Sequence, residues 1–195
     1  MSKSRLEAYT DAVIAIVITL MVLEIHVPEG ATTFAGLLPV AHNFLVYILS
    51  FLLLSMYWNN HHHLLKSVSH VGGKVLWSNN FFIFTLTMIP FSTNWLSEHL
   101  LLRDPNLLYG FVILLADFAY YILVHQLMKY NGGKSSKLYA IYGQNHKIKL
   151  TILCNVIALI AGLFLPWLTL VINLVTVIGL WLIPERGAEK VNNVK

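Results

Sequence analysis

The sequence predicts an all-α polytopic membrane protein with six transmembrane helices. Hydrophobic residues make up 57% of the 195 residues and charged residues only 11%, and the mean hydropathy is +0.67. A water-soluble domain of this length could not bury so much apolar surface. The apolar residues form runs that are each about long enough to cross roughly 30 Å of hydrocarbon as a helix. We therefore expect one six-helix domain over 1–195, with no domain boundary and no internal repeat of the six-helix unit.

Six apolar runs define the expected helices in chain order, with approximate limits 8–26, 38–58, 77–97, 106–128, 149–165 and 167–184. Pro166 separates the last two runs and predicts a tight turn between them. The alternative is one long broken helix over 149–184 with a re-entrant piece. The 129–148 segment contains GGKSSK and is expected to be a flexible loop, and a polar tail follows at 185–195.

The loops differ strongly in their content of Lys and Arg, which predicts the orientation of the helices. Across six helices, one side receives only Arg103, and the other side receives Lys3, Arg5, Lys66, Lys74, Lys129, Lys134, Lys137, Lys147, Lys149, Arg186, Lys190 and Lys195. This bias places both termini in the cytoplasm. It also explains the pI near 9.2 without binding to nucleic acid.

Polar residues of the first three helices are expected to meet at the cytoplasmic boundary. Asp11 lies there, near the start of the first helix, and a carboxylate in this position needs hydrogen-bond donors. The expected partners are histidine, asparagine and tryptophan side chains of the next two helices: Asn59, Asn60, His61, His62, His63, Trp77 and Asn80. Consecutive histidines lack the i, i+3 or i, i+4 spacing of helical metal ligands, so no metal site is expected. The alternative is an ordinary interfacial cluster.

An apolar stripe follows on the first helix. At about 100° per residue, Ile16, Leu20 and Leu23 fall within roughly 60° of one another, and Asp11 projects about 140° away from Ile16. A polar anchor beside such a stripe suggests a helix that faces something other than lipid, although packing or lipid contact would also explain it. The sequence contains no TVGYG-type segment, which excludes a conventional carbonyl filter.

Further acidic residues lie in or near the expected helices. Asp117 is mid-span, with His125 two turns later, and an intramembrane carboxylate is either a proton relay or a hydrogen-bonded structural residue. A proton-coupled secondary transporter that uses this pair is the alternative function, but the first two helices lack the breaks typical of such transporters. Glu24 and Glu29 are expected at the outer end of the first helix, where they form a vestibule or only solvate the helix end.

The segment with Arg5, Tyr9, Thr10 and Asp11 resembles the RxxxFSD signature of the transmembrane-protein-175 family, which contains the endolysosomal potassium channel and bacterial relatives. Tyr replaces Phe and Thr replaces Ser. The resemblance extends through all six helices, including the Trp and His run at 58–63 and the NNFFIFTLTMIPF stretch. It implies a potassium channel of a bacterial plasma membrane, with potassium as the permeant ion, no cofactor and no enzymatic activity.

The resemblance also assigns roles to the first helix, which lines the pore in this family. The hydrophobic constriction five residues beyond the aspartate corresponds to Ile16, the next layers to Leu20 and Leu23, and a threonine between the first two layers to Thr19. Animal members carry two repeats and pair as dimers, so a single repeat implies a homotetramer. Symmetry agrees, because one stripe cannot enclose a pathway alone. Apolar walls replace no lost hydration ligands, so the selectivity for potassium over sodium is expected to be modest.

Overall fold

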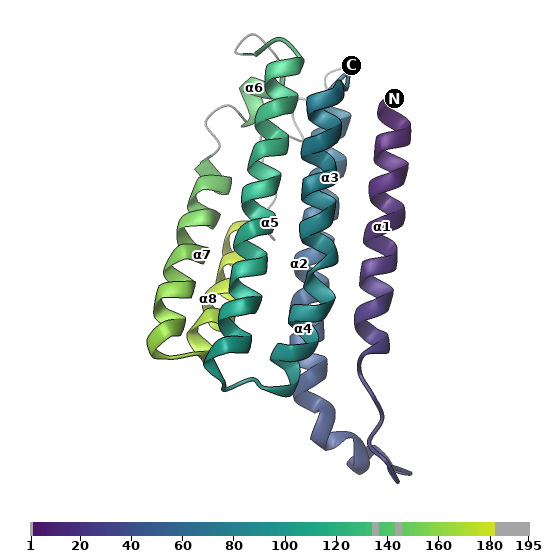
Figure 1. The fold of residues 1–195 in the computed structure, drawn as a ribbon, viewed down its shortest axis with the longest axis vertical. Helices are drawn as coiled ribbons and strands as arrows, with labels where there is room; N and C mark the ends of the chain where they lie inside the picture. The colour runs from purple at the N-terminus through teal and green to yellow at the C-terminus, as the bar shows by residue number, and fades with distance from the viewer. Residues whose placement is uncertain (1, 134–136, 143–145, 182–195) are drawn as a thin grey trace.

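The apolar runs of the sequence form helices that lie side by side, with the N-terminus and α6 at the same end (Figure 1). The computed structural model describes residues 2–133, 137–142 and 146–181. In chain order the helices are α1 (Lys3–Leu23), the 3-10 helix η1 (Phe34–Val40), α2 (Ala41–Lys66), α3 (Gly73–Thr87), α4 (Ile89–Glu98), α5 (Arg103–Tyr130), α6 (Lys137–Tyr142), α7 (His146–Phe164) and α8 (Trp167–Thr176). A five-residue π-helical segment, Val177–Trp181, continues α8. The predicted all-α class is confirmed.

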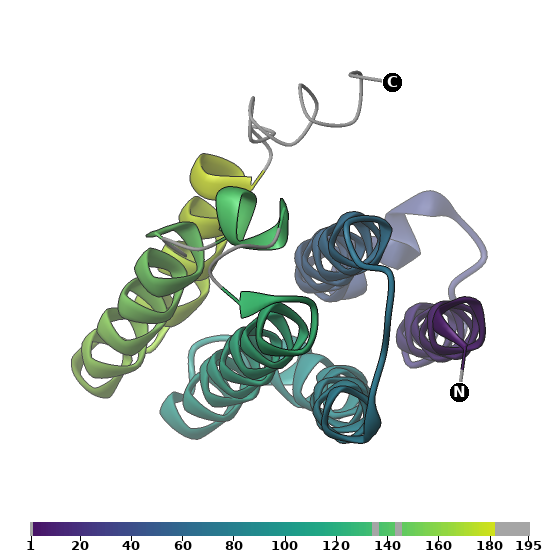
Figure 2. The ribbon, with the colours of Figure 1, turned by 90° about the horizontal axis from the view of Figure 1, so that it is seen from above.

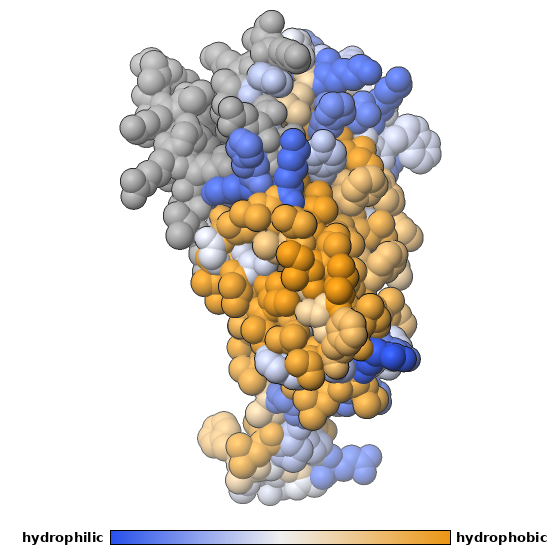
Figure 3. Space-filling model, turned by 90° about the vertical axis from the view of Figure 1, so that its left-hand side faces the viewer, coloured by the Kyte–Doolittle hydropathy of each residue, from blue (hydrophilic) through white to orange (hydrophobic). Residues whose placement is uncertain are grey.

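Four helical stretches are long and apolar enough to cross a membrane: Lys3–Leu23, Phe34–Lys66, Arg103–Tyr130 and His146–Phe164. α3 and α4 follow one another along the bundle, and α8 with its π-helical extension forms a shorter apolar helix (Figure 1). An apolar band covers the middle of the side that α7 and α8 occupy, with polar residues above and below it (Figure 3). The chain is therefore a multi-pass membrane protein.

The helix predicted over 77–97 is two helices in the structure. α3 ends at Thr87 and α4 begins at Ile89, with Met88 in a turn between them. Pro90 explains the break, because proline lacks a backbone N–H and disfavours the helical conformation of the preceding residue. The two helices keep nearly the same direction because Met88 retains helical backbone angles, φ −82° and ψ −15°.

α2 continues well beyond its predicted end at residue 58. It ends at Lys66, because Leu64 and Leu65 are buried in the core and extend the apolar contact of the helix. The three histidines at 61–63 therefore lie within α2 rather than after it. Their side chains have fixed directions on the helix, which determines the residues that each of them reaches.

The predicted turn at Pro166 is confirmed. α7 ends at Phe164 and α8 begins at Trp167, and the backbone N–H of Leu168 donates to the carbonyl of Leu165 at 3.0 Å. α8 packs back along α7 (Figure 1), so the alternative of one broken helix over 149–184 is wrong.

Parts of the predicted polar segments lie outside the described residues. They are residues 182–184 of the last predicted helix, the tail 185–195 with Arg186, Lys190 and Lys195, and Lys134 in the 129–148 loop. The described part of that loop contains α6. Gly132 and Gly133 precede it with φ of 101° and 58°, which L-residues with side chains rarely adopt, as expected for a turn.

α5 lies in the middle of the bundle and packs against α3, α4, α7 and α8. Tyr57, Phe82 and Tyr109 are among the largest fully buried side chains. α1 packs against α2, α3 and α4 at one edge of the molecule, and the α7–α8 pair forms the opposite edge (Figure 2). One face of α1 is therefore in the bundle, and the other face is uncovered.

Candidate functional site

α1 has two faces of different composition. Its buried residues are Leu6, Thr10, Ile14, Val17 and Met21. The residues of the predicted stripe lie on the other face: Ile16 is 57% exposed, Leu20 47% and Leu23 71%. Thr19 is exposed on the same side, and its hydroxyl donates to the carbonyl of Ile16 at 2.9 Å. The stripe thus points away from its own protomer, so its contacts must come from lipid, from water or from another copy of the chain.

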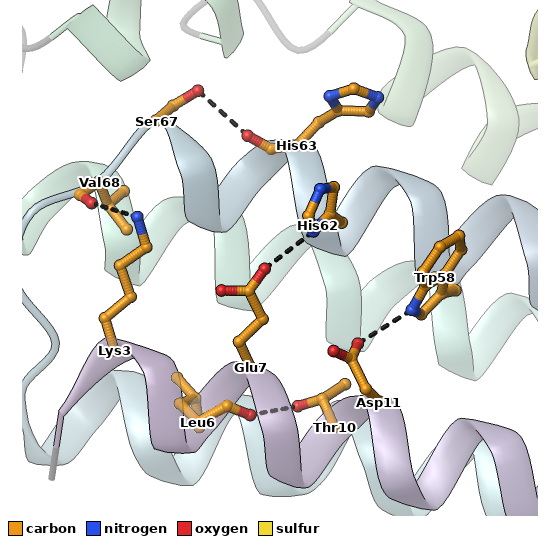
Figure 4. A network of polar contacts seen from close by, with 10 residues as sticks. All are labelled: Lys3, Leu6, Glu7, Thr10, Asp11, Trp58, His62, His63, Ser67 and Val68. Carbon is orange, nitrogen blue, oxygen red and sulfur yellow. Dashed lines mark hydrogen bonds and ion pairs between the residues drawn. The ribbon is translucent and has the colours of Figure 1, made fainter.

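The end of α1 that carries the N-terminus is bound to α2 by side-chain contacts (Figure 4). The indole Nε1 of Trp58 donates to Oδ1 of Asp11 at 2.9 Å. His62 lies one turn further along α2, and its Nδ1 contacts Oε1 of Glu7 at 2.8 Å. The rings of Trp58 and His62 are stacked, with centroids 6.0 Å apart and an interplanar angle of 15°.

These contacts form a ladder that follows from helix geometry. Glu7 and Asp11 are four residues apart on α1, and Trp58 and His62 are four residues apart on α2, so each pair lies on one face of its helix. The two helices run in opposite directions, which matches the later residue of one pair with the earlier residue of the other. Nζ of Lys3 extends the series by donating to the carbonyl of Val68 at 3.1 Å. We call the Glu7–His62 and Asp11–Trp58 contacts the α1–α2 ladder.

A second contact on the buried side of α1 connects it to α3 and α2. Nδ2 of Asn79 donates to Oγ1 of Thr10 at 3.0 Å, and Oδ1 of Asn79 lies 2.8 Å from Nε2 of His61. All three residues are fully buried. The Thr10 hydroxyl in turn donates to the carbonyl of Leu6, so each of these polar side chains has a partner.

The predicted partners of Asp11 are only partly correct. The polar cluster involves the predicted helices, but the donor to Asp11 is the Trp58 indole, and the expectation of a histidine or asparagine donor is wrong. His62 faces Glu7 instead, and His61 reaches α1 through Asn79. His63 lies edge-on to the ring of His62, with centroids 5.9 Å apart. The physical reason is the four-residue spacing of the ladder, which selects Trp58 and His62 together.

The other predicted partners lie away from α1. Asn59, Trp77 and Asn80 are exposed, and Asn60 is half-buried. Among the described residues, no hydrogen bond joins any of these four side chains to α1. Helical geometry explains this, because Asn59 and Asn60 are rotated by about 100° and 200° from Trp58 around α2.

Two residues of the N-terminal motif face outward. Tyr9 is exposed, and Arg5 is exposed with its backbone N–H bound to the Ser2 hydroxyl. At the far end of α1, Glu24 caps the helix and Glu29 follows in a turn, and both are exposed. The segment that contains η1 extends beyond the rest of the bundle at this end (Figure 1).

Asp117 lies in the interior of the protomer, between α2, α5 and α7. Its Oδ1 accepts a hydrogen bond from the hydroxyl of Tyr57 at 2.6 Å, and its Oδ2 contacts the amide of Asn155. His125 is exposed and stacks on Tyr121, so it does not share the environment of Asp117. Asp117 is hydrogen-bonded, as its structural alternative predicts, and the predicted pairing with His125 in a relay has no support in the geometry.

Sequence reasoning missed several residues that the structure brings together. Trp58 is not among the predicted partners of Asp11, although its spacing from His62 matches that of Glu7 and Asp11. Asn79, Tyr57 and Asn155 were not assigned any partner. The described residues contain no group of three His, Cys, Asp or Glu side chains placed to hold a metal ion.

Comparisons with known proteins agree on one family. The model of the family described as endosomal/lysosomal potassium channel TMEM175 matches residues 5–90. A potassium channel of Chryseobacterium sp. is 37% identical over 190 residues, which cover 97% of each chain. A potassium channel of Chamaesiphon minutus is 39% identical over 70 residues, 33% of this chain and 34% of the relative. The crystal structure of a lysosomal potassium-selective channel TMEM175 homologue from Chamaesiphon minutus superposes with a TM-score of 0.79 at 25% identity, covering 92% of this chain and 96% of that chain.

Proposed function

Since the chain belongs to the TMEM175 family, we propose that it is a potassium channel whose pore is lined by α1 of several copies. The observation that carries this proposal is the exposed apolar stripe of Ile16, Leu20 and Leu23 on a helix whose other face is fixed by buried contacts. A helix held in this way can present a constant surface to an ion pathway. Relatives named as potassium channels support the assignment of the ion, and channels are not enzymes.

The assembly that we propose is a homotetramer in the lipid bilayer. A single α1 stripe cannot surround a pathway, so several copies must place their stripes around an axis, and closed cyclic symmetry is the usual arrangement. Four copies of one six-helix unit follow from the family resemblance. The exposure of the whole stripe in the protomer is consistent with this arrangement.

In this assembly, Ile16 forms the narrowest apolar ring, and Leu20 and Leu23 form the next two. An ion that passes them sheds part of its hydration shell, which costs less for potassium than for sodium. The hydroxyl of Thr19 donates to the Ile16 carbonyl, which leaves its oxygen lone pairs to face an ion between the rings. Selectivity remains modest without a carbonyl filter, and the same apolar rings close the pore when they dewet.

The outer mouth of the pore lies at the Glu24 and Glu29 end of α1, and both termini are cytoplasmic in a bacterial plasma membrane. This orientation rests on the distribution of Lys and Arg between the loops. Four copies would gather up to eight carboxylates around the outer mouth, which raises the local concentration of cations.

The test is ion flux in liposomes that contain the purified protein, under an imposed potential and with or without a pH gradient. We expect potassium flux that follows the potential and needs no proton gradient. Flux that requires the pH gradient would instead indicate a proton-coupled transporter.

A pair of substitutions tests whether Ile16 forms the constriction of the pore. Ile16→Ala should reduce the discrimination between potassium and sodium, measured as the reversal potential in mixed ions, because it widens the apolar ring. Ile160 of α7 has a similar exposure, 54%, on the opposite edge of the protomer, so Ile160→Ala is the matched control and should leave the reversal potential unchanged. Equal reversal potentials in both variants and the parent would remove Ile16 from the pore.

A further inference from the structure

A buried polar cluster lies in the protomer interior, apart from the residues of α1. It joins Asp117 of α5, Tyr57 of α2 and Asn155 of α7, which are all nearly inaccessible; Asp117 is only 4% exposed. A cavity of about 10 Å³ adjoins it, and the polar part of its lining continues with Thr151, Asn173, Thr176 and Trp181. The cavity lining contains no residue of α1, so the cluster is separate from the proposed pore.

The carboxyl group of Asp117 has no positively charged partner in the described part of the chain. Its hydrogen-bond partners are a phenol and an amide. Among the described residues, the cavity lining besides Asp117 consists of apolar, hydroxyl, amide and indole groups, and Tyr57 is the one other titratable residue in it. An ionised carboxylate buried among such groups in a membrane protein is very costly. Either a proton or a small cation must therefore neutralise it.

The amide of Asn155 favours the proton. Its Oδ1 is buried and has no hydrogen-bond partner within the described part of the chain, while its Nδ2 is placed against Asp117. The two ends of an amide are assigned from the hydrogen-bond network and not from their shape. When the amide is turned over, Oδ1 lies against Asp117 and gains a partner only if Asp117 supplies a proton. Nδ2 then takes the position in which Oδ1 had no partner, and one water in a cavity of this size would be its acceptor.

We propose that Asp117 is a proton-binding site: the neutral carboxylic acid donates a hydrogen bond to Oδ1 of Asn155 and accepts one from the hydroxyl of Tyr57. One proton thus removes the uncompensated charge and pairs the orphaned amide oxygen. A monovalent cation in the cavity would also compensate the charge, but an ionised Asp117 can only accept from Nδ2 of Asn155. Oδ1 of Asn155 would then still need a donor or the cation itself as its partner. The neutral acid connects α2, α5 and α7 through one hydrogen bond from Tyr57 and one to Asn155.

The consequence is a site that is loaded with a proton while the channel works and that weakens the protomer when it loses the proton. Deprotonation at alkaline pH leaves a buried charge between three helices. The folded protein should therefore become less stable at high pH, and this loss should be absent in Asp117→Asn, whose amide cannot ionise.

Infrared spectroscopy of the full-length protein in liposomes tests the proposal directly. We expect a carbonyl band of a protonated carboxylic acid at neutral pH, which shifts in samples prepared in D₂O and disappears in Asp117→Asn. The other acidic residues among the described ones are exposed or half-buried, and Glu98→Gln is the matched control that should keep the band. Tyr57→Phe removes one donor and should shift the band to higher frequency, which tests the site even if Asp117→Asn does not fold.

Two results would overturn the proposal. One is a parent spectrum without the band, which shows an ionised Asp117. The other is a band that appears only when potassium and sodium are replaced by choline, which shows that a monovalent cation occupies the site. Neither result tests the proposed pore, because ion flux through the pore is measured in a separate experiment.

Discussion

The hydrogen bond between Trp58 and Asp11 can be tested from both of its ends. Asp11→Ala removes the acceptor, and Trp58→Phe removes the N–H donor while it keeps an aromatic ring to stack on His62. The two changes and their combination form a double-mutant cycle, which isolates the energy of the contact. We expect the two substitutions to be less than additive, because either one already breaks the same hydrogen bond.

The structure sets the expected size of this coupling. A hydrogen bond to a charged group contributes about 1.5–3 kcal/mol to stability, and exposure to solvent lowers this value. Trp58 is 43% exposed and Asp11 is half-buried in the protomer, so we expect a coupling energy of about 1 kcal/mol in the monomer. If neighbouring copies cover the ladder in the tetramer, the coupling should rise toward about 2 kcal/mol, because water no longer competes for the carboxylate.

The assay is chemical unfolding in detergent, followed for the monomer and for the assembled protein, with the reversal potential measured for every variant that assembles. Trp95 is another partly exposed tryptophan, in α4, so the cycle of Asp11→Ala with Trp95→Phe is the matched control and should be additive within about 0.5 kcal/mol. A Trp58 cycle that is equally additive would refute the ladder. Normal assembly of Asp11→Ala with altered ion selectivity would show instead that Asp11 lines the pore.

Two other predictions concern the outer mouth and the α7–α8 hairpin. Replacing Glu24 and Glu29 together by Gln should lower the single-channel conductance at low potassium and leave it unchanged near 1 M salt, where the Debye length is about 3 Å; equal conductance at low salt would rule out the vestibule. Gly162→Ala should destabilise the protein by about 1–3 kcal/mol in chemical unfolding, because the added Cβ would lie 2.0 Å from the hydroxyl of Thr169. Gly179→Ala is its control, because the added Cβ meets no atom of the described residues within 4 Å, and an equally small effect of both changes would contradict the close packing of α7 on α8.

The all-α class, the approximate positions of the long helices and the outward direction of the α1 stripe could be predicted from the sequence. Apolar length defines a membrane helix, and angular position on a helix follows from residue spacing alone. Pro90 indicates a break near Met88, but the apolar run over 77–97 is continuous and therefore predicts a single helix. The polar run at 58–63 predicts that the second helix ends there, and only the structure shows that α2 continues to Lys66.

The polar contacts were harder to predict, because they depend on which helices are neighbours and on the axial position of each helix relative to the next. The α1–α2 ladder could in principle have been predicted from the sequence, because Glu7 and Asp11 have the same four-residue spacing as Trp58 and His62. The partners of Asp117 were not accessible, because nothing in the sequence indicates that α2 and α7 both reach the middle of α5. Tyr57 and Asn155 each lie in a mostly apolar stretch of their helix, and only packing reveals that they converge.

The two contacts of the α1–α2 ladder require the same axial position of α1 relative to α2. This position determines what the contacts would contribute to the proposed pore. Sliding α1 past α2 by one helical turn, about 5.4 Å along the axis, would break the Glu7–His62 and Asp11–Trp58 contacts at once and would move Ile16 by the same distance. The buried contact of Asn79 with Thr10 resists the same movement from α3. All of these residues lie within the 5–90 segment that matches the family model. Because the anchor is on the far side of α1 from the stripe, we expect it to fix the height and direction of Ile16 relative to the bundle in the proposed pore rather than to bind the ion.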